Sequence, residues 1–454
     1  NYEMLWEDDS DESVKWIQDE FDYFWNSQYA VNLADFIVND LNRISKRLVI
    51  GLNDWRDNSD EGVPSVAVEE PVYRKEFGLW EHQKYFVGLA FREHKKDGGA
   101  RYLLADQVGL GKTLQLAMSA KLMALYGDKP VLIIVPKTLV WQWQDEMKTF
   151  LDMPSAVWTG SGWQDENGYF YQADSVRSIL KCPRRVGIIS QGLVSRRTEA
   201  ADLLAQKDFE CVILDEAHRA RRRNPTEDPN THKADPNYLL QFLNKITFKT
   251  KSLLLATATP VQINPIEAFD LINALSLPTS KVMGDLYSEW HKKPQLMLEM
   301  VCGKEPYPES EIKMWDIIRN PLPTKSLSSQ DRVNRIRDKL DISDETYVLP
   351  ADYYASLSGS KKESIRTLYT TDDFIANYNP YIRHIVRRTR DFLENTIDPA
   401  SGEPYLKKII VELYGEGDDG AIPLEGYLRQ AYSKAQEFCT LLSSRVKAGG
   451  FMST

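Results

Sequence analysis

One stretch of the chain, residues 101–113, constrains the fold more than any other. It reads RYLLADQVGLGKT: an apolar run at 102–105 leads without a spacer into Gly-Leu-Gly-Lys-Thr, and helix-forming residues follow at 114–125. This order predicts a buried strand, a glycine-rich loop and a helix. Glycines let the backbone N–H groups of such a loop close on phosphate oxygens, and a helix N-terminus favours the same negative charge. The stretch therefore predicts a phosphate-binding site.

Two side chains of this loop have predicted roles of their own. We expect Lys112 to reach the β- and γ-phosphates of a nucleotide, and the Thr113 hydroxyl to ligate Mg²⁺. Asp106 stands where the common pattern G-x-x-x-x-G-K-[ST] has its first glycine, and a chance Gly-x-Gly-Lys-Thr in a loop is the alternative. The other residues expected to line the nucleotide are Asp106, Gln107, Val108, Gly109, Leu110 and Gly111.

Four more apolar runs predict further strands of one parallel sheet. Each is continuous rather than alternating, which is typical of strands covered on both faces, and helical patterns separate them. We therefore predict an α/β fold, a doubly wound parallel sheet with its functional residues at the carboxyl ends of the strands. Thr138 is the expected cap of the helix after the first of these runs. The runs occupy residues 131–136, 186–190, 211–218 and 252–260.

Acidic residues end the third of these runs. Asp215 and Glu216 follow an apolar strand, where an unpaired carboxylate is costly unless it binds something. We expect Asp215 to hold Mg²⁺ and Glu216 to orient or deprotonate the attacking water. The alternative is a strand that ends in a polar turn in solvent.

Three other polar residues are candidates at the same edge. His218 follows the acidic pair, and Thr257 and Thr259 end the next strand. We expect these three to relay between nucleotide and a polymer, although a lone histidine often only packs and a threonine there also serves as a helix cap.

Gln83 is a candidate for recognition of the base. It lies about 30 residues before the phosphate loop, and its amide matches adenine N6 and N7. Taken alone, it is more simply a surface glutamine.

A basic cluster follows the acidic pair directly, in a chain whose net charge is −10. It fits two interpretations equally well: a contact with nucleic-acid phosphates, or a solvated loop beside a carboxylate site. The cluster consists of Arg219, Arg221, Arg222 and Arg223.

Length and composition limit the remaining possibilities. At 454 residues the chain exceeds what one core usually holds, so about two or three folded units are expected. Its four cysteines lie far apart without a C-x-x-C pair, which favours a reducing intracellular compartment over a zinc site or a disulfide framework. No apolar run approaches the roughly 18 residues of a membrane span, so we expect no membrane partner.

Taken together, these segments resemble the Swi/Snf-type ATPases of helicase superfamily 2. The sequences LADQVGLGKT, VLIIVPKTLVWQWQDE, LDEAH, LLLATATPVQINPIEAFDLINAL and IRHIVRRTRDFLE occur in the order and approximate spacing of that family. The resemblance covers residues 80–275 and, less closely, 381–442. It implies a RecA-like first helicase lobe that binds ATP, Mg²⁺ and the phosphate backbone of double-stranded DNA.

The resemblance also implies roles that spacing alone does not. Arg387 and Arg388 match the paired arginines on the helix that bridges the two lobes of these enzymes, and we expect them to couple the nucleotide site to DNA. Gln107 replaces a family glutamate that does not contact phosphate. The family's second and third motifs are matched by Pro136, Trp143 and Glu146, and by Thr257, Thr259, Pro260 and Asn264.

The function expected from this resemblance is ATP-dependent translocation on, or remodelling of, double-stranded DNA. A DExH-type RNA helicase is the first alternative, and the Trp143 motif and the arginine pair favour the Swi/Snf side. A nucleotide-binding scaffold that never hydrolyses ATP is the second, and Glu216 argues against it. The expected compartment is the bacterial cytoplasm or the eukaryotic nucleus.

We expect five parts along the chain. An N-terminal helical region at 1–50 is acidic and aromatic, which suits protein partners, and its stretch 21–33 resembles the tail of the phospholipase D-like domain that some bacterial helicase-type ATPases carry upstream. A linker at 51–75, the RecA-like lobe at 76–276 and a helical protrusion at 277–380 follow. Bridging helices at 381–454 are expected to lead to a second RecA-like lobe beyond the chain, whose arginine finger ATP hydrolysis would need.

Overall fold

The computed structural model describes residues 18–20, 22–23, 79–226, 234–259, 265–325, 332–369 and 378–397, with short stretches between 402 and 436. The chain divides into two units, one ending at Tyr405 and the other beginning at Leu406. All elements from α5 to α20 belong to the first unit. Most of the predicted helical region at 1–50 and the whole of the predicted linker at 51–75 lie outside the described residues, as do Pro260 and Asn264.

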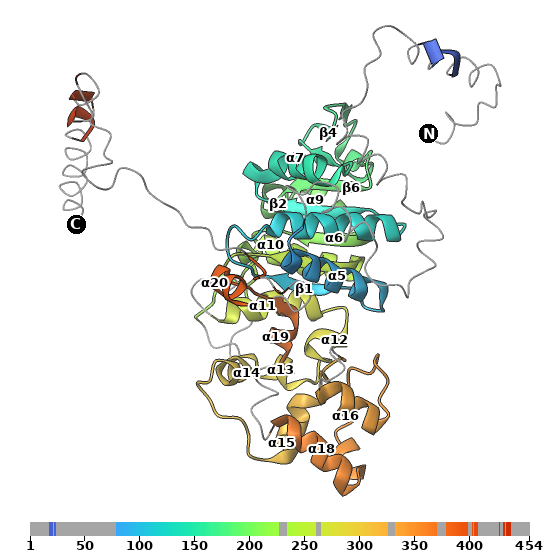
Figure 1. The fold of residues 1–454 in the computed structure, drawn as a ribbon, viewed down its shortest axis with the longest axis vertical. Coiled ribbons are helices and arrows are strands. Elements are labelled where there is room, and N and C mark those ends of the chain that lie inside the picture. The colour runs from blue at the N-terminus through green and yellow to red at the C-terminus, as the bar shows by residue number, and fades with distance from the viewer. Residues whose placement is uncertain are drawn as a thin grey trace. The chain divides into compact units, whose positions relative to one another are not determined.

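A nine-stranded sheet organises the first unit (Figure 1). Its strand order is β5-β4-β3-β6-β2-β7-β8-β1-β9. The strands from β3 across to β9 run parallel, and β4 and β5 join antiparallel at one edge. The strands are β1 Arg101–Leu104, β2 Val131–Val135, β3 Ala156–Trp158, β4 Gly162–Asp165, β5 Phe170–Gln172, β6 Val186–Ser190, β7 Phe209–Leu214, β8 Thr250–Ala256 and β9 Ile385–Val386.

Helices cover both faces of this sheet. On one face α5, α6 and α7 share a core with alternate strand residues such as Ile133, and on the other α10 and α11 share a core with residues such as Ile134. Because neither face is open, the strands are continuous apolar runs, and the predicted doubly wound α/β fold is confirmed. These helices are α5 Glu81–Lys95, α6 Lys112–Tyr126, α7 Val140–Leu151, α8 Gln191–Ser195, α9 Glu199–Leu204, α10 Tyr238–Ile246 and α11 Ile266–Ser276.

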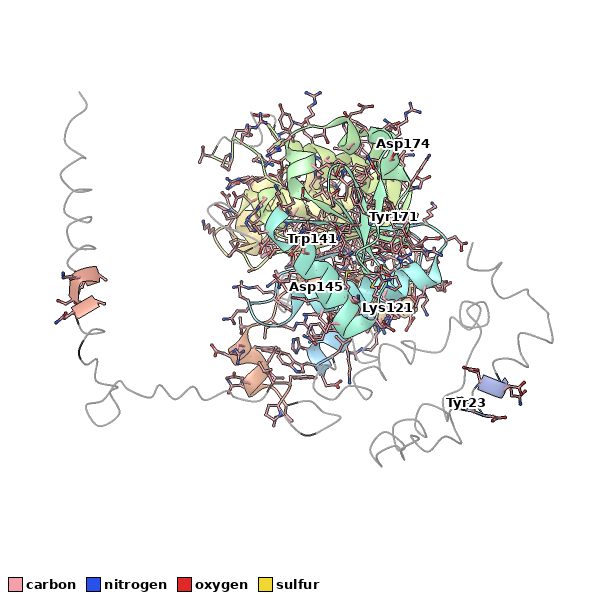
Figure 2. The ribbon with its side chains drawn as sticks, turned by 90° about the horizontal axis from the view of Figure 1, so that it is seen from above. Tyr23, Lys121, Trp141, Asp145, Tyr171 and Asp174 are labelled. Atoms are coloured by element: carbon pink, nitrogen blue, oxygen red, sulfur yellow. The ribbon has the colours of Figure 1, made fainter. Side chains whose placement is uncertain are left out.

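Helix α7 shows how one helix divides between core and solvent. Trp143 and Met147 are buried against the sheet, while Trp141 and Asp145 lie on the exposed side (Figure 2).

Helix α7 begins later than predicted. Residues 137–139 form a 3₁₀ turn closed by a hydrogen bond from the Leu139 N–H to the Pro136 carbonyl at 2.9 Å, and no side chain caps α7. The predicted cap at Thr138 is therefore wrong, because that residue lies inside the turn.

Strand β9 was not predicted from the sequence. It has only two residues, which pair with Leu103 and Leu104 of β1 and extend the sheet beyond that strand. The next helix, α20, spans Arg390–Asn395. The expectation that Arg387 and Arg388 lie on a bridging helix is therefore wrong at these positions. Hydrogen bonds from the loop after β1 keep the chain extended through residue 388.

The described residues between 277 and 380 form helices and no strand. Their core includes Trp290 and Trp315, each at most 2% exposed, and the Trp290 indole donates to the Ile317 carbonyl at 3.1 Å. The assignment of this range as a separate protrusion stays a prediction. The elements are α12 Ser280–Met283, α13 Glu289–Lys292, α14 Pro294–Val301, α15 Glu311–Ile318, α16 Arg332–Leu340, α17 Tyr353–Ser356 and α18 Gly359–Tyr369, and α19 Pro380–His384 leads into β9.

Among the described residues, no helix is both long enough and apolar enough to cross a bilayer.

The turn before β1 provides a test of how tightly the sheet is packed. Gly99 has φ +64°, and a Cβ at this position would overlap the Lys251 carbonyl oxygen. We expect Gly99→Ala to lower the free energy of unfolding by about 3 kcal/mol, because backbone strain and steric overlap add. Gly168→Ala is the matched control, since Gly168 has φ +85° with no neighbour within 4 Å, and should lose only about 1 kcal/mol. Equal losses in urea unfolding would contradict this account.

Candidate nucleotide site

The phosphate loop connects the carboxyl end of β1 to α6. Gly109 and Gly111 have φ values of +86° and +69°, a region that glycine enters without strain. Gly111 is the N-cap of α6, so the unpaired N–H groups of the first helical turn border the loop. Val108 is 75% exposed, and Thr113 is half-buried in the first turn of α6. The predicted strand, loop and helix are all present.

Gln83 packs against this loop from the first turn of α5. It is 3% exposed, and its amide nitrogen donates to the Leu110 carbonyl at 3.2 Å. Its amide oxygen accepts the Trp80 N–H at 2.9 Å. A Cβ at Gly111 would overlap the Gln83 amide, which is a second reason why only glycine fits there. Gln83 is not a surface residue, and its contact with adenine stays a prediction.

Lys112 folds back onto the loop that precedes it. Its ammonium donates to the Asp106 carbonyl oxygen at 2.9 Å. Burial lowers the pKa of Lys112, whereas the negative charges of Asp106, Asp215 and Glu216 act to raise it. The phosphate loop and the acidic pair at the end of β7 therefore lie close enough for their charges to interact, as the sequence predicts for residues at the carboxyl ends of the strands of one parallel sheet.

Asp215 is held in place by donors from three directions. It is 8% exposed, and its carboxylate accepts the Trp143 indole N–H at 3.2 Å and the Glu216 N–H at 2.8 Å. Its carbonyl accepts the Gln191 amide at 2.6 Å. Burial raises the pKa of Asp215, and the Glu216 N–H, the indole and the charge of Lys112 partly oppose that rise. This enclosed carboxylate excludes the alternative of a strand that ends in solvent.

A chain of contacts leads from the acidic pair to the end of β8. Glu216 has φ +47°, which is unusual for a residue with a side chain. Its carboxylate lies 3.2 Å from His218 Nδ1, and the same nitrogen lies 2.9 Å from the Thr257 hydroxyl. The Thr257 hydroxyl also accepts the Thr259 N–H at 3.1 Å. The three residues predicted to couple nucleotide to a polymer therefore form one connected group, while that role itself stays a prediction.

The basic cluster divides between structure and surface. Arg222 is 4% exposed and forms a two-pronged ion pair with Asp270 of α11, at 2.6 and 2.8 Å. Arg219, Arg221 and Arg223 are exposed. Neither interpretation of the cluster therefore holds for all four arginines, because Arg222 joins the β7 loop to α11.

Arg388 reaches the phosphate loop from the segment after β9. Its side chain is 10% exposed and that of Asp106 is fully buried, and their ion pair measures 2.6 Å. The same guanidinium donates to the Gln115 side chain of α6 at 2.7 Å and to the His82 carbonyl of α5. The Asp106 carboxylate therefore faces Arg388. The sequence placed these two residues in different predicted groups, because 282 residues separate them.

The donors at this edge suit Mg²⁺ and a nucleotide. Thr113 and Asp215 offer a hydroxyl and a carboxylate, the hard oxygen ligands that Mg²⁺ prefers. Among the described residues, no group of three or more His, Cys, Asp or Glu side chains is arranged to hold a metal by itself. Mg²⁺ bound together with a nucleotide would take much of its coordination from water and phosphate oxygens.

Comparison with known proteins identifies the family. The sequence matches the model of the SNF2-related domain over residues 82–320. Chromodomain-helicase-DNA-binding protein 6 of Rattus norvegicus is 31% identical over 225 residues, which are 45% of this chain and 8% of that protein. The ISWI chromatin-remodeling complex ATPase ISW2 of Saccharomyces cerevisiae is 31% identical over 230 residues, which are 50% and 18%. The solved Sulfolobus solfataricus SWI2/SNF2 ATPase core in complex with dsDNA aligns with TM-score 0.37 and 15% identity, covering 69% of this chain and 45% of that one.

The fold and the site define a RecA-like lobe with a phosphate loop. The family match covers more than half of the chain, and the chain belongs to the SNF2-related family. The resemblance to Swi/Snf-type ATPases is thereby confirmed. The chain spans less than a fifth of the length of either curated relative, so the activities of those whole proteins are carried over only as proposals.

The division of the basic cluster predicts unequal effects on stability. We expect Arg222→Ala to lower the free energy of unfolding by about 3 to 5 kcal/mol, because it leaves the Asp270 carboxylate buried without its partner. Arg221→Ala and Arg223→Ala, which remove the same charge from exposed positions, should change it by no more than about 0.5 kcal/mol. The measurement is urea unfolding of the three variants, and similar losses in all three would contradict the assignment.

Proposed function

We propose that this chain provides the ATP-binding lobe of a Swi/Snf-type ATPase that acts on double-stranded DNA. The observation that carries the proposal is the convergence of Lys112, Asp215 and Glu216 at one edge of the sheet, with Trp143 donating to Asp215. Family membership supports ATP as the nucleotide. The two relatives are named as a helicase-DNA-binding protein and a chromatin-remodeling complex ATPase, which supports DNA as the polymer.

The residues at this edge would divide the work as follows. Lys112 and the N–H groups of its loop bind the phosphates, and Gln83 contacts the base. Thr113 and Asp215 hold Mg²⁺, which neutralises charge on the phosphate oxygens when it is bound. Glu216 is the more exposed member of the acidic pair and orients or deprotonates the attacking water. His218, Thr257 and Thr259 connect this carboxylate to the end of β8.

The two alternatives are less well supported. The family match and the buried Trp143 beside Asp215 favour the Swi/Snf side over a DExH-type RNA helicase. A scaffold that binds nucleotide without turnover has no need of an acid such as Glu216 near the loop. The backbone of Glu216 beside His218 has a positive φ, which costs free energy. This cost argues that the position of the Glu216 carboxylate serves a function.

The nucleotide assignment is tested by two substitutions with different expected effects. Lys112→Ala should weaken binding of a fluorescent ATP analogue with Mg²⁺ by roughly 10- to 150-fold, because one charge-assisted phosphate contact is lost. Glu216→Gln should bind like the wild type and lose any turnover, because only water activation is removed. Binding is measured by titration and turnover by phosphate release. Equal affinity of Lys112→Ala and wild type would contradict the assignment.

The polymer assignment is tested through salt dependence. Arg221 and Arg223 are the charges we expect on phosphates, and Arg222 is left intact because it pairs with Asp270. On duplex DNA, Arg221→Gln with Arg223→Gln should reduce the log–log salt slope by about 0.9 per lost contact. Arg177→Gln with Lys181→Gln removes the same charge from exposed positions elsewhere and should leave the slope unchanged. If both pairs change the slope equally, the arginines act only through net charge.

A further inference from the structure

We propose that Arg388 is a positioning residue for the phosphate loop, which it holds in its binding geometry through the Asp106 carboxylate. The proposal rests on the proposed function and goes beyond it, because it gives Arg388 a role at the nucleotide and none on DNA. It also explains why an aspartate replaces the first glycine of the common loop pattern.

The ion pair between Arg388 and Asp106 is buried and has several hydrogen bonds, unlike an ion pair on the protein surface. Asp106 is fully buried. Its carboxylate accepts three N–H groups of Arg388: the backbone N–H at 2.9 Å, Nε at 3.0 Å and Nη2 at 2.6 Å. Buried, forked contacts of this kind fix direction as well as distance. Arg388, in the segment after β9, thus fixes the orientation of Asp106, the first residue of the loop.

The neighbours of Asp106 are held by the same segment. The Ala105 N–H donates to the Val386 carbonyl at 2.7 Å, and the Gln107 N–H donates to the Arg388 carbonyl at 3.0 Å. The Gln107 side-chain oxygen accepts the Arg390 N–H at 2.9 Å. Three successive residues at the start of the loop therefore take their geometry from residues 386–390. The Lys112 ammonium then contacts the carbonyl of the middle one.

The guanidinium also joins the two helices that flank the loop. Its Nη2 donates to Gln115 Oε1 at 2.7 Å, and its Nη1 donates to the His82 carbonyl. Gln115 in turn donates to the Leu110 carbonyl at 3.3 Å and to Asp106 Oδ2 at 3.2 Å. The Arg388 guanidinium therefore hydrogen-bonds to the start of α5 and the start of α6 as well as to the loop. A lysine cannot replace it, because a single ammonium does not span these acceptors.

Exposure separates Arg388 from its neighbour. The Arg388 side chain is 10% exposed and its donors are occupied by protein acceptors, whereas Arg387 is exposed. A DNA phosphate would have to displace Asp106 to reach the Arg388 guanidinium. The two arginines that the sequence places together therefore have different tasks.

The first experiment measures nucleotide binding to the 454-residue chain. We expect Arg388→Ala and Arg388→Lys each to weaken binding of a fluorescent ATP analogue with Mg²⁺ by about tenfold or more. Guanidinium chloride, far below unfolding concentrations, should restore part of the affinity of Arg388→Ala and none of that of Lys112→Ala. Arg184→Ala is the matched control: it breaks an ion pair with Asp165 and Glu166 at the far edge of the sheet and should bind like the wild type.

A second readout does not depend on nucleotide. Hydrogen exchange of the amides at 105–112 should be faster in Arg388→Ala than in the wild type, and unchanged in Arg184→Ala. Asp106→Asn changes the other partner of the contact. Adding Arg388→Gln to Asp106→Asn should weaken binding less than Arg388→Gln does in the wild type, because the two residues share one interaction. Wild-type affinity and wild-type exchange in Arg388→Ala would overturn the proposal. A wild-type chain that binds no nucleotide would overturn the proposed function, and the exchange rates would still decide the role of Arg388.

Discussion

The parallel alignment of β6, β2, β7, β8 and β1 is the constraint on which the site depends. Parallel strands all point their carboxyl ends toward one edge, so the phosphate loop, Gln191, Asp215 and Thr257 meet there although they are far apart in sequence. The same arrangement buries both faces of the sheet. Backbone polar groups are then satisfied within the sheet, and the edge is left to side chains with chemical functions.

Paired charges stabilise this edge where apolar packing ends. A buried carboxylate costs several kcal/mol unless donors surround it, and Asp106, Asp215 and Asp270 do not all meet that requirement in the same way. Asp106 and Asp270 face guanidinium groups. Among the described residues, the hydrogen-bond donors to the Asp215 carboxylate are an indole and a backbone N–H, and burial raises the pKa of Asp215. It is the one of the three whose environment a bound cation would improve.

The sequence predicted what depends on local pattern and missed what depends on distant contacts. The strand, loop and helix around Lys112 follow from glycine chemistry and apolar period, and so do the five strands that form the centre of the sheet. The burial of Arg222 could not be predicted, because its partner Asp270 lies 48 residues away on another helix. Strand β9 was missed because two residues show no period, and the short antiparallel arm β3 to β5 was missed for a similar reason.

Strand β9 has a consequence for the order in which this lobe is assembled. Its partner, β1, is made early, but β9 and Arg388 follow only after the helices between 277 and 380 have been synthesised. Contacts across such sequence distances form late, because long loops must close first. A nascent chain that ends before residue 385 therefore carries a complete phosphate-loop sequence in which the Asp106 carboxylate still lacks its ion pair with Arg388. The chain would then become able to hold nucleotide only after Arg388 has been synthesised, late in chain elongation.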